Sequence, residues 1–163
     1  MLMTFRAGLV AAGLVFIAPG LSHAGQPIYS VTGKIAAEQG AVRAIGAEDF
    51  AKIGPVEIRT KVLTLGEEQR SVKGVLARDL MKYLGAKGEY MKLVALDGYI
   101  IDVPVADIRK YDVVIATEID GKTLSVRDKG PAWLIYPVSD HQELDDTVYE
   151  ARSVWQIRTI EFN

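Results

Sequence analysis

The side chains best suited to hold a flat, polar ring lie in three short stretches of this sequence. The first is Ala95–Tyr99, in which the carboxylate of Asp97 and the phenol of Tyr99 flank Gly98 between two apolar segments. A turn explains this stretch most simply, with Asp97 accepting backbone amide bonds and Gly98 at positive φ. A carboxylate and a phenol also bind the donor groups of a ligand, so both interpretations remain open.

The second and third stretches supply aromatic rings and an arginine. A strand held between two prolines carries Trp133 and Tyr136 on opposite faces, one of which belongs to the core while the other is a candidate wall of an aromatic pocket. Further on, alternation predicts a terminal strand with Trp155 on its buried face, so a core role is favoured for Trp155 and ligand contact is the alternative. Arg152, just before that strand, has a planar fork that suits heteroaromatic rings, carboxylates and phosphates.

The sequence lacks the residues that several other kinds of functional site need. The chain has no cysteine and two histidines, His23 and His141, and the latter sits in a polar stretch typical of a solvated loop. Zinc-ligand spacing, a glycine-rich phosphate loop and a nucleophile elbow are all missing. The formal net charge of −2, with acidic and basic residues interspersed, also argues against a nucleic-acid partner.

Residues 1–24 are expected to be a cleavable signal peptide. Arg6 precedes the uncharged run Ala7–Ala18, and Ser22-His23-Ala24 offers small residues at the two positions that a signal peptidase reads. The apolar run is shorter than the roughly 20 residues that a membrane-spanning helix needs. Cleavage near Ala24 would leave residues 25–163 as a single, disulfide-free domain in the periplasm or outside the cell.

The elements that must position these side chains are mostly short strands. Apolar, β-branched runs bounded by turn residues predict strands at Ile28–Lys34, Val56–Leu63, Tyr90–Leu96, Tyr99–Val103, Val113–Ile119, Ala132–Tyr136 and Ser153–Phe162. Asp120-Gly121 predicts a tight hairpin. Helices are expected at Glu48–Ile53, Val75–Leu84 and Pro104–Lys110. The fold class is therefore α+β, mainly β, with a mostly antiparallel or mixed sheet and short helices.

A series of short segments, in order and spacing, resembles the molybdopterin-binding domain of sulfite-oxidase-type oxidoreductases. The resemblance covers essentially all of residues 25–163 and implies that fold. The segments that carry it are Val31–Ile35, Ile58–Thr60, Lys73–Leu76 with Asp79-Leu80, Asp97–Tyr99 with Pro104, Ile115-Ala116, Asp120–Lys122, Asp128–Pro131, Arg152–Val154 and Ile160.

The departures from that family concern the metal and the phosphate. Where the enzymes carry a cysteine that ligates molybdenum, this chain has Thr60 and Lys61, and neither replaces a soft thiolate. Where they carry an arginine for the cofactor's phosphate, it has Trp133. Tyr99 and Arg152 match the enzymes' active-site tyrosine and a basic position before the last strand. The resemblance thus implies that the bound ligand is a ring system without a phosphate tail and without molybdenum.

The Trp155-Gln156 pair makes the chain more similar to a small subgroup of exported, cysteine-less relatives. That resemblance implies binding of a reduced pterin and a relay to a membrane partner such as a diguanylate cyclase or sensor kinase. A molybdopterin-dependent oxidoreductase, or its subunit, and a ligand-free interaction or assembly module are the alternatives. The candidate ligand-binding residues are Thr60, Asp97, Tyr99, Trp133, Arg152 and Trp155.

Overall fold

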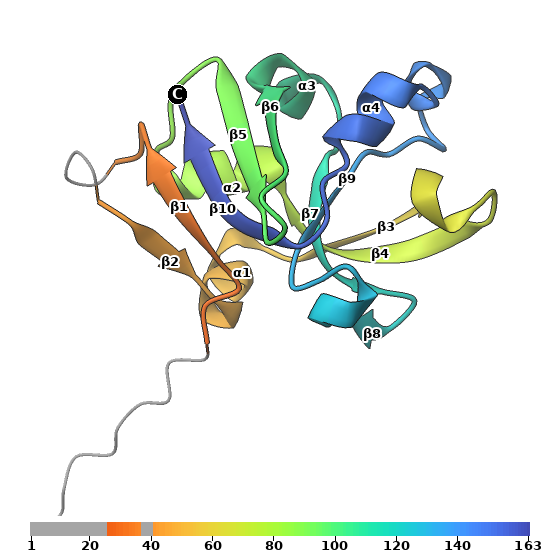
Figure 1. The fold of residues 1–163 in the computed structure, drawn as a ribbon, viewed down its shortest axis with the longest axis horizontal. Coiled ribbons are helices and arrows are strands. Elements are labelled where there is room, and N and C mark those ends of the chain that lie inside the picture. Colours follow the sequence, from red (N-terminus) through yellow and green to blue (C-terminus); the bar gives the residue numbers. More distant parts are fainter. Residues whose placement is uncertain (1–25, 37–40) are drawn as a thin grey trace, which may run out of the picture.

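The computed structural model describes residues 26–36 and 41–163 (Figure 1). The predicted signal peptide, residues 1–24, lies outside the described residues. Within the described ranges, no helix is both long and apolar enough to cross a membrane. The described chain folds into two sheets and several short helices, so the predicted class, α+β and mainly β, is confirmed.

The first sheet joins the two ends of the described chain, in the order β2-β1-β10-β5-β6. Its neighbours are antiparallel except for β1 and β10, which run parallel. The C-terminal strand therefore lies in the middle of this sheet (Figure 1). The strands are β1 (Tyr29–Gly33), β2 (Arg43–Ile45), β5 (Tyr90–Ala95), β6 (Ile100–Pro104) and β10 (Ile157–Phe162).

The second sheet has the order β3-β4-β7-β8, and β9 pairs with β7 next to β8. All of its pairs are antiparallel. The strands are β3 (Val56–Lys61), β4 (Gln69–Leu76), β7 (Val114–Ile119), β8 (Lys122–Thr123) and β9 (Trp133–Ile135). The hairpin predicted at Asp120-Gly121 joins β7 to β8 with φ angles of 49° and 73°, and this prediction is confirmed.

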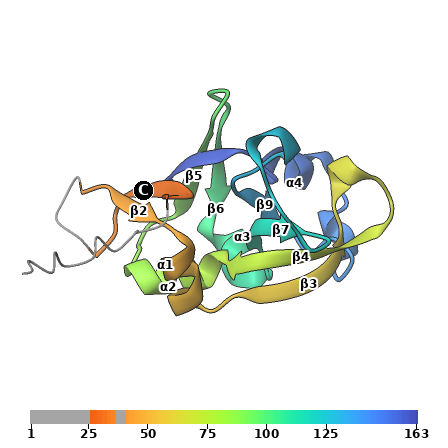
Figure 2. The same ribbon diagram turned by 90° about the horizontal axis from the view of Figure 1, so that it is seen from below.

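Short helices pack around both sheets. Figure 2 shows α1 and α2 together near one end of β4, with α4 nearer the other end. The α-helices are α1 (Ala47–Ile53), α2 (Ala77–Leu84), α3 (Val105–Lys110) and α4 (Thr147–Arg152), and the 3-10 turns are η1 (Leu63–Leu65), η2 (Val126–Asp128) and η3 (Gln142–Leu144). Gly85 ends α2 in the left-handed conformation, at the stop that the sequence indicates.

Within the second sheet, β9 and the first half of β7 are buried on both faces, which explains their continuous apolar runs. Leu134 and Tyr136 face the larger cluster between the sheets, whereas Trp133 and Ile135 face a smaller cluster on the opposite side. Trp133 is 1% exposed. Both faces of this strand are therefore mostly core, and Trp133 also borders a hollow beside β8 and η2, separate from the cavity described below.

Two predicted elements begin later than the sequence suggests. Val75 and Leu76 belong to β4, which the sequence did not reveal, so the helix expected at Val75–Leu84 begins at Ala77. Gly74 lets this segment pair closely with β7 as a strand. A Cβ at this position would lie 2.1 Å from a backbone oxygen of β7, so the close approach requires a glycine.

The C-terminal strand begins at Ile157, not at Ser153. Gln156 takes a left-handed φ of 53°, and the pairing of β10 with β5 shifts register between Ile157 and Thr159. A left-handed residue interrupts the two-residue alternation on which the prediction relied. Trp155 consequently leaves the buried face and is 36% exposed, so its predicted burial is wrong.

Candidate binding cavity

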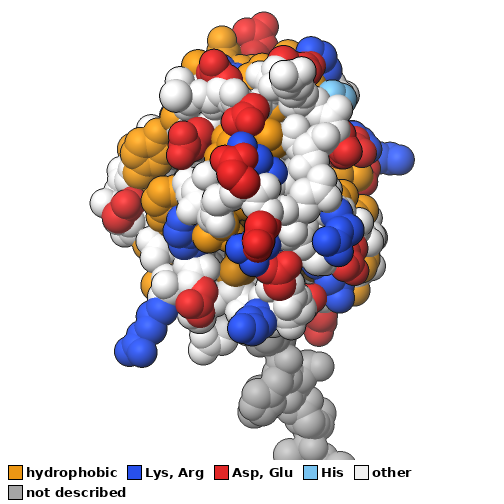
Figure 3. All heavy atoms as spheres, turned by 90° about the vertical axis from the view of Figure 1, so that its right-hand side faces the viewer, with side chains coloured by type: hydrophobic (Ala, Val, Ile, Leu, Met, Phe, Trp, Pro, Cys, Tyr) orange, Lys and Arg blue, Asp and Glu red, His pale blue; other side chains and the backbone are white. Residues whose placement is uncertain are grey.

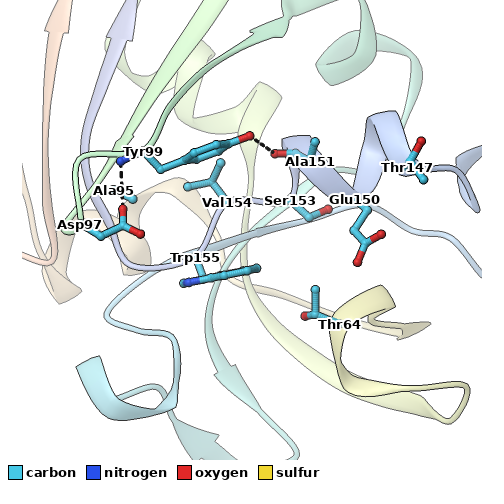
Figure 4. Close-up of a pocket in the computed structure, with 10 residues that line it drawn as sticks. All are labelled: Thr64, Ala95, Asp97, Tyr99, Thr147, Glu150, Ala151, Ser153, Val154 and Trp155. Atoms are coloured by element: carbon cyan, nitrogen blue, oxygen red, sulfur yellow. Dashed lines mark hydrogen bonds between the residues drawn. The ribbon is translucent and has the colours of Figure 1, made fainter.

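A cavity of about 330 Å³ opens where the turn between β5 and β6 meets α4 and the segment that leads into β10 (Figure 4). Apolar and aromatic groups dominate its wall, and a few polar side chains reach it. The lining residues are Thr64, Ala95, Asp97, Tyr99, Thr147, Glu150, Ala151, Ser153, Val154 and Trp155. Its size matches the lower end of small-molecule sites in proteins, roughly 300–1,000 Å³.

The β5–β6 turn fixes two of these residues. An Asp97 carboxylate oxygen accepts a hydrogen bond from the backbone N–H of Tyr99 at 2.9 Å, and Gly98 has a φ of 89°. The Tyr99 hydroxyl donates to the carbonyl of Ala151 at 3.3 Å and so ties the turn to α4. The turn interpretation is confirmed, and the same stretch carries two side chains that line the cavity.

The aromatic side chains lie across the cavity from each other. Figure 4 shows the rings of Tyr99 and Trp155 on opposite sides, both seen nearly edge-on, with Val154 between them at the back. Asp97 lies at one end and Glu150 at the other. A flat ring inserted between the two aromatic side chains would therefore stack on them while its edges faced carboxylates.

Lys129 supports the Trp155 ring without lining the cavity. Its ammonium lies 4.4 Å from the centroid of the Trp155 ring and 4.8 Å from that of Trp133, and it donates to the Thr64 hydroxyl at 3.1 Å. The two indoles meet edge to face at 6.0 Å. Burial lowers the pKa of Lys129. Cation–π contact with two rings and a hydrogen bond to η1 hold the Trp155 wall in place.

Arg152, predicted as a ligand-binding residue, does not line the cavity. It donates to the Asp107 carboxylate at 2.8 Å and lies over the ring of Tyr149, 5.5 Å from its centroid. The same carboxylate accepts from the Tyr136 hydroxyl at 3.0 Å. Burial, followed by the charge of Asp107, raises the pKa of Tyr136. Arg152 thus joins α4 to α3 through a partly buried ion pair, a structural role that the sequence did not suggest.

Thr60 and Trp133 also lie away from the cavity and serve the fold. Thr60 is fully buried, and its hydroxyl accepts from the backbone N–H of Ser139 at 3.1 Å. The Trp133 indole donates to the carbonyl of Ser153 at 3.1 Å. Of the six predicted residues, the cavity brings together Asp97, Tyr99 and Trp155.

The sequence analysis missed the polar residues that α4 and η1 contribute, namely Thr64, Thr147 and Glu150. For α4 a signal was present, because Asp146 caps the helix and accepts from the backbone N–H of Val148 at 2.8 Å. An aspartate before a short amphipathic run is a usual helix start. No comparable signal marks Thr64.

The described residues do not fit a molybdenum centre of the kind that the sulfite-oxidase-type enzymes carry. No thiolate ligand exists in the chain, since it has no cysteine, and the Thr60 hydroxyl is engaged with backbone groups. Among the described residues there is no group of three or more His, Asp or Glu side chains placed to hold a metal ion. A hard hydroxyl is a poor substitute for a thiolate, so no chemistry is assigned through that metal.

The face of the molecule that carries α4 and the β3–β4 hairpin has mixed charge. Figure 3 shows acidic and basic side chains interspersed there, with apolar side chains between them. Lys61, for example, pairs with both Glu67 and Asp145. This face lacks the single-sign field that attracts nucleic acid.

Comparison with solved structures shows a likeness in fold. The chain is similar in structure to the sulfane dehydrogenase SoxCD from Paracoccus pantotrophus, with a TM-score of 0.60 and 15% sequence identity over 83% of this chain. The shared property is the fold. The match spans 37% of the dehydrogenase chain. No protein-family model matches the sequence, and no curated protein matches it.

Proposed function

We propose that residues 25–163 form an exported protein that binds a pterin in the cavity between Tyr99 and Trp155. The observation that carries this proposal is the placement of two aromatic side chains on opposite sides of one cavity, with the Asp97 carboxylate at its end (Figure 4). A pterin is flat and has paired donors on one edge, so it matches this set of groups.

Asp97 is the group best placed for the paired donors of the ring. One of its oxygens is fixed by the Tyr99 backbone N–H, and the hydrogen bonds within the described residues leave the other oxygen free. Because the turn already orients this carboxylate, little conformational entropy is lost when it binds. Arg152, which the sequence suggested as a ligand-binding residue, is engaged with Asp107 instead.

Titration calorimetry with the protein purified after export tests this proposal. Trp155→Leu should weaken the binding of a reduced or oxidised pterin by about tenfold or more, because stacking on an aromatic ring contributes roughly 1–3 kcal/mol. Asp97→Asn should have an effect of about the same size, since it removes a charge-assisted hydrogen bond. Tyr90→Leu, a change of an exposed tyrosine outside the cavity, is the matched control. Absence of heat at millimolar pterin would refute the proposal.

We also propose that the ligand-bound protein signals to a membrane partner, a diguanylate cyclase or sensor kinase. The support is the sequence resemblance, including Trp155-Gln156, and the predicted signal peptide. Cross-linking in intact cells followed by mass spectrometry should recover a membrane protein with a cyclase or kinase domain. The yield should fall in the Asp97→Asn variant. Equal recovery with wild type and variant would contradict a ligand-dependent relay.

A further inference from the structure

The charged groups that line the cavity are all acidic. Asp97 and Glu150 supply two carboxylates, and none of the lining residues is a lysine, arginine or histidine. The two nearby cations have other partners: Arg152 pairs with Asp107, and Lys129 lies against the indoles of Trp133 and Trp155. A ligand in this cavity therefore meets negative charge that no lining cation offsets.

The two carboxylates differ in how they are held. Asp97 is oriented by the turn, as described above. Glu150 lies on α4 and has no hydrogen bond or ion pair from its side chain to any other part of the chain that the structure describes. Figure 4 shows it pointing toward Thr64, at the end of the cavity away from Asp97. Its charge is thus available to whatever part of a ligand reaches that end.

We infer that the cavity selects pterins by charge, and that Glu150 is the specificity-determining residue that disfavours an anionic substituent on the ring. This inference rests on the proposed function. The paired donors and the C6 substituent lie at opposite ends of a pterin. With the donor edge on Asp97, the C6 substituent points toward Glu150. A neutral or cationic substituent is accepted there, and a carboxylate or phosphate faces a like charge.

The size of the effect follows from the exposure of the site. Glu150 is open to solvent, so the repulsion between two unit charges about 5 Å apart is screened by an effective dielectric of about 40–80. That repulsion weakens an anionic ligand by about fourfold to fifteenfold relative to a neutral one. Screening by salt should shrink the difference further, because the Debye length falls to about 3 Å at 1 M.

Two pterins with a neutral and an anionic substituent at C6 test the inference. Calorimetry of the protein purified after export would compare 6-hydroxymethylpterin, which is neutral, with 6-carboxypterin, which is an anion at neutral pH. Wild type should bind the neutral ligand about fourfold to fifteenfold more tightly. Glu150→Gln should reduce this preference to about twofold by strengthening 6-carboxypterin binding, with the affinity for 6-hydroxymethylpterin unchanged. Glu48→Gln on α1 makes the same charge change outside the cavity and should leave the preference intact.

The outcomes separate this inference from the proposed function. If neither pterin binds, the proposed function is refuted and the inference with it. If both bind with equal affinity to wild type, pterin binding stands and charge selection is overturned. A preference that persists in Glu150→Gln overturns the role of Glu150, because its charge would then be irrelevant to the choice between the two ligands.

Discussion

Truncation of the two tryptophans should lower the stability of the protein by different amounts. Trp133 is 1% exposed, packs in the smaller core cluster and donates to the Ser153 carbonyl. Trp133→Ala should therefore destabilise the protein by about 3–5 kcal/mol, as for other buried aromatic residues. Trp155 is 36% exposed and borders an open cavity, so its removal leaves no sealed void. Trp155→Ala should destabilise by only about 1–2 kcal/mol.

Urea denaturation followed by circular dichroism measures both changes, with an unchanged slope as the condition for comparing midpoints. For a domain of this size, about 1 kcal/mol corresponds to about 4 °C in Tm. The Tm should thus fall by about 12–20 °C for Trp133→Ala and by about 4–8 °C for Trp155→Ala. Trp155→Phe, which keeps a ring, should retain most pterin binding, whereas Trp155→Ala should not. A larger loss of stability at Trp155 than at Trp133 would refute the assignment of core and cavity wall.

Four further results are expected. Gly74→Ala should destabilise the protein by about 1–3 kcal/mol in urea denaturation, because the added Cβ would meet the β7 backbone at 2.1 Å; full stability would show that the strands can separate. Arg152→Ala should also cost about 1–3 kcal/mol by breaking the partly buried pair with Asp107, and a loss of binding at full stability would contradict this. NMR titration of 13C-dimethylated lysines should show Lys129 titrating at lower pH than Lys61, since burial lowers the pKa of the former and hydrogen bonds to carboxylates raise that of the latter. Because the folded pKa of Lys129 lies below its unfolded value, its charge opposes folding fully at pH values below the folded pKa, and that opposition is lost as the pH rises from the folded to the unfolded pKa; the reverse order of titration would be incompatible with its burial. Elemental analysis of protein from a host that makes molybdenum cofactor should find no stoichiometric molybdenum, and finding it would mean that ligands other than a thiolate hold the metal.

Local patterns predicted much of the fold. Alternating apolar runs identified most of the long strands, and the φ angles at Asp120-Gly121 are those that the hairpin signal requires. The β4 strand was missed because its apolar end, Val75-Leu76, fits either a strand or the start of a helix. Pairing with β7, set by the close approach at Gly74, decides between them. Sequence periodicity contains no information about such a long-range contact.

Only part of the candidate site was predicted, because sequence patterns report local contacts and not long-range ones. Asp97 and Tyr99 act through a local turn, which its Asp-Gly signal made visible. Trp155 was assigned to the wrong face because one left-handed residue, Gln156, changes the phase of the alternation. The true partner of Arg152, Asp107, is 45 residues away in the chain, and no local pattern connects the two.

The parallel pairing of β1 with β10 makes the synthesis of β10 a condition for folding of the first sheet. Without β10, the first sheet would separate into a β1–β2 pair and a β5–β6 hairpin, each with an unpaired edge. The contact joins residues that are far apart in sequence, which favours slow folding after β10 has been synthesised. Trp155 sits two residues before that strand. A ligand ring that stacks on Trp155 would therefore bind only to molecules in which β10 is in place. Products truncated before β10 would be unable to bind it and prone to aggregate.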